Sequence, residues 1–148
     1  MISISSKLPT ILRILVGLVF TIFGLNGFLN FMPQPPQPEA AGAFLGGLAG
    51  AGYFFPMLKL TEIVAGVALL ANRFVPLALA VLAPVVVNIA AFHVFLSPGG
   101  LPIALVLVVA LAATAYAYRD AYRPMLAARV EPATAVASSN HAAPAPAE

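Results

Sequence analysis

The chain has 148 residues, of which 61% are hydrophobic and only 8% are charged, with seven Lys and Arg against five Asp and Glu. Too few polar side chains are present to cover the surface of a water-soluble domain of this size, so a soluble fold is excluded. The chain has no cysteine, which excludes disulfides, thiolate metal sites, iron–sulfur clusters and thiol chemistry carried by its own residues.

Four long apolar runs follow one another and predict membrane-spanning helices at about residues 11–31, 55–71, 74–96 and 101–118. A helix needs roughly 20 apolar residues to cross a hydrocarbon core about 30 Å thick, and only the second run is short. Its helix is expected to begin near Pro56, because proline is tolerated at the first helical position. The sequence therefore predicts an all-α polytopic membrane protein, with a four-transmembrane-helix bundle in residues 1–126.

The connection between the first two spans differs from the other two. Residues 33–38 are rich in proline and are expected to be extended, because each proline fixes its own φ and pushes its predecessor out of the helical region. The small and apolar residues that follow Glu39 predict a short external interfacial helix, ended by Gly50 and Gly52. At the other end of the chain, the Ala- and Pro-rich residues 127–148 predict a disordered tail.

The basic residues set the expected orientation. Six of the seven lie where the runs end on one side, at Lys7, Arg13, Arg73, Arg119, Arg123 and Arg129. Lys and Arg are enriched in cytoplasmic loops, so both termini are predicted to be cytoplasmic. The first apolar run is too long for a cleaved signal sequence and is expected to be retained. Because the basic residues lie singly, the expected contact is anionic membrane lipid and not nucleic acid.

Arg13 lies one turn inside the first run. It is expected to extend its side chain to the cytoplasmic headgroups, with Asp120 as an alternative partner inside the bundle. Close approach between the first two spans is expected on separate grounds, because they carry small residues that let helix backbones touch, namely Gly17, Gly24, Gly27 and Gly66.

Polar side chains within the spans are costly in lipid and often mark a site. Six of them fall toward the outer ends of the first three spans and form the predicted ligand-binding set: Asn26, Asn30, Lys59, Glu62, Asn88 and His93. Glu62 and His93 are the members suited to a proton relay or to binding a polar headgroup.

The spacing of these six residues indicates which can meet. Lys59 and Glu62 are three residues apart and can pair, and the two asparagines of the first span share one face. Asn88 and His93 diverge by about 140° around their helix. For the asparagines, simple pairing between helices is an equal alternative, and Lys59 can reach the nearby surface.

Several stretches resemble the DoxX family of small four-helix bacterial membrane proteins. The resemblance covers about residues 8–126 and is carried by Arg13 with Gly17, residues 23–28 (FGLNGF), Gly52, Tyr53, Pro56, Glu62, Gly66, Leu69, Leu70, residues 83–89 (APVVVNI), Phe92, His93, Phe95, Leu96 and residues 117–120 (AYRD). It implies a bacterial inner-membrane protein. Its relatives are linked to a thiosulfate:quinone oxidoreductase and to membrane complexes that counter oxidative or thiol stress. The resemblance supplies no catalytic residue.

Three functions fit this pattern. The first is an accessory or anchoring subunit for a membrane redox partner protein, and the second is a quinone- or lipid-binding protein that uses the outer polar residues, with a non-covalent quinone as its only cofactor. The third, a small permease, is disfavoured because only Thr114 and Arg13 are polar in the inner half of the spans. One intramembrane histidine cannot supply both axial ligands of a haem. No metal site or intrinsic catalysis is expected, and the pattern allows a homo-oligomer.

Overall fold

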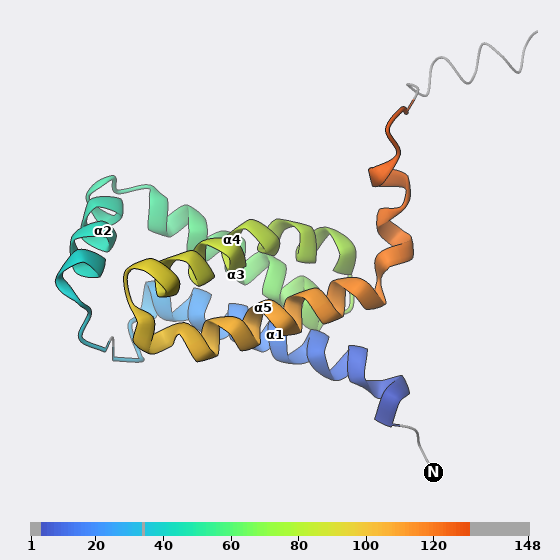
Figure 1. Cartoon of the computed structure of the whole chain (residues 1–148), viewed down its shortest axis with the longest axis horizontal. Helices are drawn as coiled ribbons and strands as arrows, with labels where there is room; N and C mark the ends of the chain where they lie inside the picture. Colours follow the sequence, from blue (N-terminus) through green and yellow to red (C-terminus); the bar gives the residue numbers. More distant parts are fainter. Residues whose placement is uncertain (1–3, 34, 131–148) are drawn as a thin grey trace, which may run out of the picture.

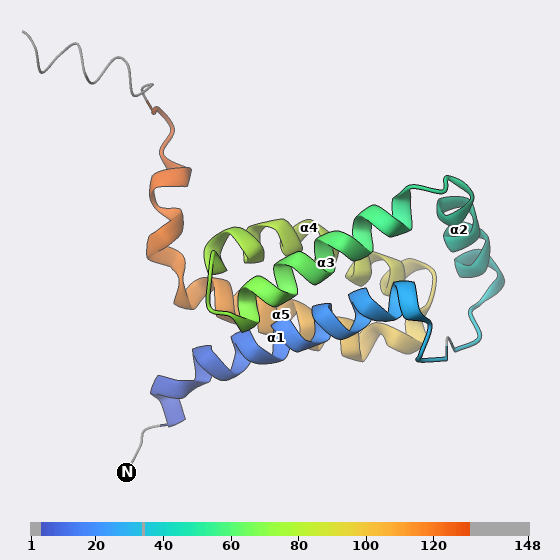
Figure 2. The ribbon, with the colours of Figure 1, turned by 180° about the vertical axis from the view of Figure 1, so that it is seen from behind.

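The structure is a computed structural model that describes residues 4–33 and 35–130. Within these ranges the chain forms helices and connections without a strand, which confirms the all-helical prediction. Four helices lie side by side as an elongated bundle, and a fifth, α2, lies across one end (Figures 1 and 2). The bundle helices are α1 (Ile4–Leu29), α3 (Phe54–Leu70), α4 (Val75–Phe95) and α5 (Leu101–Ala117), and α2 spans Glu39–Gly50.

Among the described residues, three stretches are long and apolar enough to cross a membrane. They are Lys7–Leu29 of α1, Val75–Phe95 of α4, and Pro98–Ala117, which joins the short 3-10 helix η1 (Pro98–Gly100) to α5; their mean hydropathies are 2.1, 2.3 and 2.2. α3 has 17 residues, about 26 Å of helix at 1.5 Å per residue. It joins α2 through a bend of 91°, so these two helices together count as a fourth span only as a bent pair.

The helix ends follow local sequence signals. α1 begins at Ile4, earlier than the apolar run, and contains Pro9 as its sixth residue, where the missing N–H removes one helical hydrogen bond. It ends before Asn30, which takes a left-handed φ of 50° that asparagine tolerates better than most residues. The predicted helix after Glu39 is present as α2. Of the predicted tail, residues 131–148 lie outside the described residues.

α1 and α3 pack with almost no space between their backbones. A Cβ atom added at Gly66 would lie 2.5 Å from Thr21 Oγ1 and 2.9 Å from the carbonyl oxygen of Gly17. A Cβ at Gly24 would lie 2.7 Å from Cγ1 of Ile63. The predicted close approach of the first two spans through their glycines is therefore confirmed.

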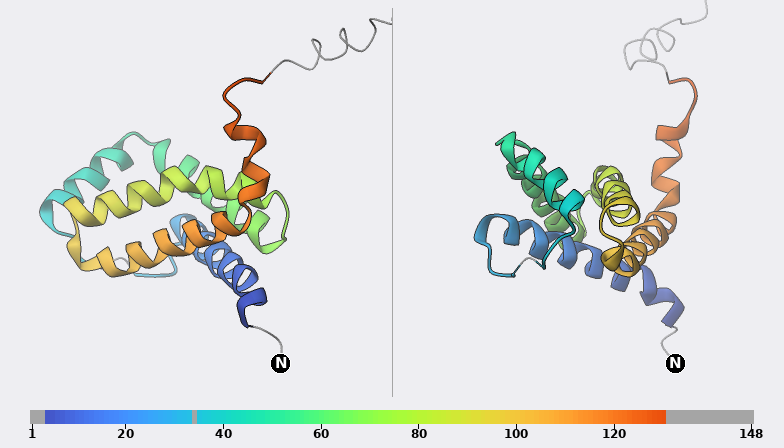
Figure 3. Two further views of the ribbon diagram at one scale, coloured as in Figure 1. Left: turned by 45° about the vertical axis from the view of Figure 1, so that its right-hand side comes forward. Right: turned by 60° about the vertical axis from the view of Figure 1, so that its left-hand side comes forward.

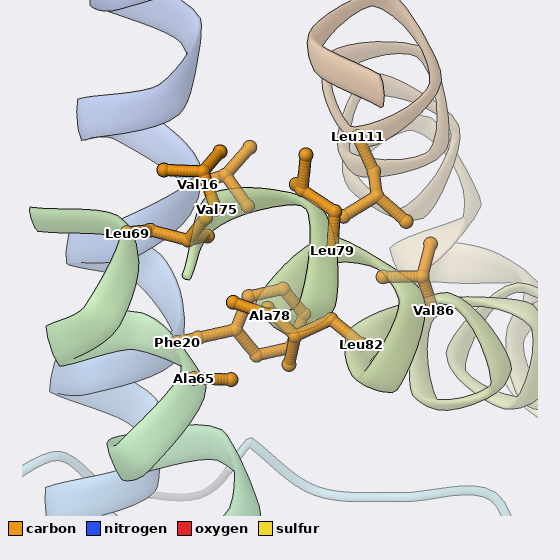
Figure 4. Packing of buried hydrophobic residues seen from close by; sticks show 10 residues of the cluster. All are labelled: Val16, Phe20, Ala65, Leu69, Val75, Ala78, Leu79, Leu82, Val86 and Leu111. Carbon is orange, nitrogen blue, oxygen red and sulfur yellow. The ribbon is translucent and has the colours of Figure 1, made fainter. Parts of the chain in front are cut away.

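The apolar core lies between all four bundle helices (Figure 4). The ring of Phe20, from α1, points toward Ala78 and Leu82 of α4. The buried cluster consists of Val16, Phe20, Ala65, Leu69, Val75, Ala78, Leu79, Leu82, Val86 and Leu111. Large apolar side chains also cover the outside of the bundle, for example Ile103 and Val106, which are 78% and 69% exposed. Such a surface is expected for helices whose neighbours are lipid tails.

The two ends of the bundle differ. α2, the start of α3 and η1 lie at one end, which we call the α2 end. The described N-terminus, the turn from α3 to α4 and the residues after α5 lie at the opposite end, called here the terminal end (Figure 1). Beyond α5 the chain forms two short 3-10 helices, η2 (Arg119–Tyr122) and η3 (Pro124–Leu126), and leaves the bundle at a steep angle (Figure 3).

Candidate functional site

The most distinctive polar contact inside the bundle is an ion pair on α3. Lys59 Nζ lies 2.8 Å from Glu62 Oε2, and the Lys59 and Glu62 side chains are 22% and 4% exposed. The aliphatic stem of Lys59 lies against Gly27 of α1, where an added Cβ would come within 2.5 Å of Lys59 Cγ. The pair that the sequence spacing allows is therefore present, at the α2 end and against α1.

The buried carboxyl group of Glu62 depends on this pairing. An ionised carboxylate taken out of water is strongly disfavoured unless a cation or several donors replace its hydration. Lys59 supplies that cation from one helical turn away and keeps part of its side chain exposed. The pair consequently has one protected member and one that can be reached from outside.

Asn26 lies in the last turn of α1, and Asn30 directly follows the helix. Asn26 is 4% exposed, and its Oδ1 accepts a hydrogen bond of 2.7 Å from the backbone N–H of Met32. The backbone N–H of Asn30 donates to the carbonyl oxygen of Asn26 at 2.9 Å, while the Asn30 side chain is exposed. Both residues therefore shape the turn into the proline-rich connection.

His93 ties the end of α4 to that same connection. Its Nδ1 lies 2.9 Å from the carbonyl oxygen of Ser97, and the Ser97 hydroxyl donates to Gln37 Oε1 at 3.1 Å. The imidazole also occupies the space directly above Gly100, leaving no room for a Cβ there. This chain of contacts joins residues 60 positions apart, and Ser97 and Gln37 carried no signal in the sequence that linked them.

Asn88 lies on the exterior of the bundle. Its side chain is exposed on α4 and donates to the carbonyl oxygen of Pro84 at 2.9 Å, one turn earlier in the same helix. His93 on the same helix is half-buried, so the two residues diverge as their spacing predicts. Of the six predicted residues, the structure brings Lys59 and Glu62 into contact, and it places Asn88 on the outer surface.

Arg13 differs from its prediction. It is 6% exposed, and its Nη1 donates to the carbonyl oxygens of Leu69 and Leu70 at the end of α3. The last carbonyls of a helix lack helical partners and carry partial negative charge, which a guanidinium satisfies. The expected reach to the headgroups is therefore wrong, and so is the Asp120 alternative, because Asp120 lies 3.4 Å from Arg123.

Two apolar grooves run along the outside of the bundle. The groove between α4 and α5 has a volume of about 350 Å³ and is lined by Leu79, Ala80, Ala83, Val86, Val87, Val108, Leu111, Ala112, Ala115 and Tyr122. The groove between α3 and α4 has a volume of about 390 Å³ and is lined by Leu60, Thr61, Val64, Ala65, Ala68, Phe74, Leu77, Ala78 and Val81. Their apolar walls suit a hydrocarbon chain, and none of the six predicted residues lines either groove.

Comparison of the chain with protein-family models, with curated proteins and with solved structures gives no significant match. The resemblance to the DoxX family therefore stays a prediction from the residues. Among the described residues, no group of three or more His, Asp or Glu side chains lies close enough together to hold a metal ion.

Proposed function

We propose that the chain is a four-span inner-membrane protein of the DoxX type that serves as an accessory or anchoring subunit of a membrane-associated redox or oxidative-stress system. The fourth span in this proposal is α3, with α2 lying along the outer surface. α3 is only a few ångströms shorter than the hydrocarbon core, and a polar group near its end can reach the interface.

The proposed orientation has both termini in the cytoplasm. Its support is that the described N-terminus, the α3–α4 turn and the residues after α5 gather at the terminal end (Figure 1). Five of the seven basic residues of the chain belong to these segments, and a sixth, Arg13, binds the end of α3 next to the α3–α4 turn. The positive-inside rule assigns such an end to the cytoplasm.

The accessory role is supported by the polar side chains within the helices, which bind other groups of the same chain. Lys59 pairs with Glu62, Asn26 binds a backbone N–H, and Arg13 binds the end of α3. Thr21 and Thr114 donate to carbonyl oxygens of their own helices at 2.8 and 2.7 Å. Side chains used in this way maintain a scaffold, whereas the broad apolar exterior is available to lipid and to a partner's spans.

The test is photo-crosslinking in the native membrane. A benzophenone amino acid at Val106 of α5 or at Val64 of α3 would report on two separate exterior faces, since these residues are 69% and 62% exposed. The proposal predicts a discrete cross-link from one face to a cofactor-binding membrane protein, with lipid adducts from the other face as the matched control. Lipid adducts alone from both faces would contradict an accessory role.

A second candidate, quinone or lipid binding, is favoured by one observation. The α3–α4 groove begins at Leu60 and Thr61, which are next in sequence to Lys59. Lys59 itself packs toward α1. A quinone or lipid whose headgroup binds Lys59 and whose tail lies in the α3–α4 groove would therefore extend around α3. Native mass spectrometry of protein extracted with its surrounding membrane separates the two candidates. A small-molecule mass that is lost from both Glu62→Gln and His93→Ala supports this one, and a bound protein that both variants retain supports the accessory role.

A further inference from the structure

Residues 118–130 form a segment that projects from the terminal end of the bundle, and we call it the C-terminal arm (Figures 1 and 3). Its base is fixed to α4, because the Tyr122 hydroxyl donates to the carbonyl oxygen of Pro76 at 2.9 Å. Burial raises the pKa of Tyr122 above 10.0, which keeps the phenol protonated as a donor. The arm therefore starts at a defined level, beside the first turn of α4.

The arm has both basic and apolar side chains that are exposed, because no other part of the described chain packs against them. Arg119, Arg123 and Arg129 are exposed, and the one acidic residue, Asp120, makes a solvent-exposed pair with Arg123 at 3.4 Å. The apolar members are as uncovered as the charged ones: Met125, Leu126 and Val130 are 68%, 79% and 75% exposed. Such a segment matches the boundary between headgroups and acyl chains, where arginines meet phosphates and apolar side chains leave water.

The direction of the arm fits that boundary. The bundle helices run along the membrane normal in the proposed topology, and the arm leaves them at a steep angle, so its course follows the membrane surface. Near the base of the arm, the Arg119 guanidinium lies 4.7 Å from the centre of the Tyr116 ring at the end of α5. Tyrosine and arginine together are typical of the interfacial layer of membrane proteins.

We propose that the C-terminal arm lies in the headgroup layer and binds anionic phospholipid, with its arginines on the phosphates and Met125, Leu126 and Val130 at the acyl boundary. Charge complementarity favours a negatively charged lipid, because the arm has three arginines and one aspartate, and the aspartate already pairs with Arg123. Each basic residue at an anionic surface strengthens binding about fivefold. The inference rests on the proposed insertion of the bundle in a membrane and is independent of any redox partner.

The first test uses a chain that has no cysteine. A Leu126→Cys variant of the full-length protein, carrying a nitroxide label, is reconstituted in nanodiscs of phosphatidylcholine and in nanodiscs that also contain phosphatidylglycerol. Phosphatidylglycerol is expected to move the label from contact with a water-soluble relaxation agent to contact with dissolved oxygen. An Ala71→Cys label in the exposed α3–α4 turn is the matched control and should not respond. A Leu126 label that stays in water in both lipids would overturn the proposal.

The second test removes charge from the arm. Arg119→Gln with Arg129→Gln should weaken phosphatidylglycerol retention in native mass spectrometry by roughly 25-fold, and Asp120→Asn should strengthen it. These side chains are exposed, so helicity measured by circular dichroism should not change. The parent and the double variant could retain phosphatidylglycerol equally, or the Leu126 label could be immersed equally in both lipids. Apolar contact or another class of partner would then explain the exposed side chains of the arm. Either result would refute anionic lipid recognition.

Discussion

Glu62 is almost fully buried, and its carboxylate lies 2.8 Å from the ammonium group of Lys59, which stays partly exposed. This asymmetry makes the two residues unequal in their effect on stability. Removing one partner of a fully buried ion pair costs roughly 3–5 kcal/mol of stability. Lys59→Met should destabilise the bundle by less than this, because water can reach the site. Lys59→Met combined with Glu62→Gln should recover part of that loss.

Unfolding in detergent, followed by circular dichroism, measures both variants of the pair. The coupling energy from the double-mutant cycle is the quantity to compare. A double variant that is less stable than Lys59→Met alone would show that the pair is not the reason for the effect.

The contact between Gly66 and Gly17 predicts a strong dependence on residue size. Gly66→Ala should cost about 1–3 kcal/mol, because the new Cβ would lie 2.5 Å from Thr21 Oγ1 and 2.8 Å from the Thr21 backbone nitrogen. Gly46→Ala in α2 is the matched control, since no heavy atom lies within 4 Å of its Cβ position. It should leave the thermal midpoint unchanged or raise it slightly. Equal midpoints for the two variants would contradict the close α1–α3 packing.

The position of His93 above Gly100 predicts a specific rescue. Gly100→Ala should destabilise the α4–α5 connection by about 1–3 kcal/mol, because its Cβ would overlap the imidazole ring. His93→Ala in the same chain should remove that penalty, whereas Gly99→Ala, which meets open space, should be neutral. The three variants are compared by their detergent unfolding midpoints. Additive losses for Gly100→Ala and His93→Ala would place the ring elsewhere.

The burial of Arg13 at the end of α3 predicts a local effect. Arg13→Met should keep the packing of the side-chain stem but leave the carbonyls of Leu69 and Leu70 without this donor, at a cost of about 2 kcal/mol. Hydrogen exchange should accelerate in the last turn of α3 and in the α3–α4 turn. Arg119→Gln, at an exposed position, is the control and should not change exchange there. Unchanged protection in Arg13→Met would contradict the capping role.

The helices were predictable from the sequence because long apolar runs leave little choice of secondary structure. Glycine spacing also identified the close pair, α1 and α3, since few residues other than glycine allow such an approach. The rotation of each helix was harder to predict. α5 is apolar on all sides, so its sequence does not indicate which face packs against the core. Likewise, the exposure of Asn88 depends on how α4 packs against its neighbours.

Tertiary contacts between distant segments account for the remaining differences. Arg13 looked like a surface residue because its partners are backbone carbonyls 56 and 57 positions away, which no side-chain pattern reveals. The Ser97–Gln37 contact was equally hidden, because it joins two loop residues. Lys59 and Glu62 were found because their partnership is local to one helix.

Thiol labelling of single-cysteine variants counts the membrane crossings of the chain. Gly99, Ala71 and Ala127 are exposed in η1, the α3–α4 turn and the C-terminal arm, and each can become the only cysteine of the chain. Four membrane spans with cytoplasmic termini predict that an impermeant thiol reagent labels Gly99→Cys in intact cells and labels Ala71→Cys and Ala127→Cys only after the membrane is opened. Labelling of Ala71→Cys and Ala127→Cys in intact cells, with Gly99→Cys protected until the membrane is opened, would show that α3 does not cross and would contradict the four-span protein.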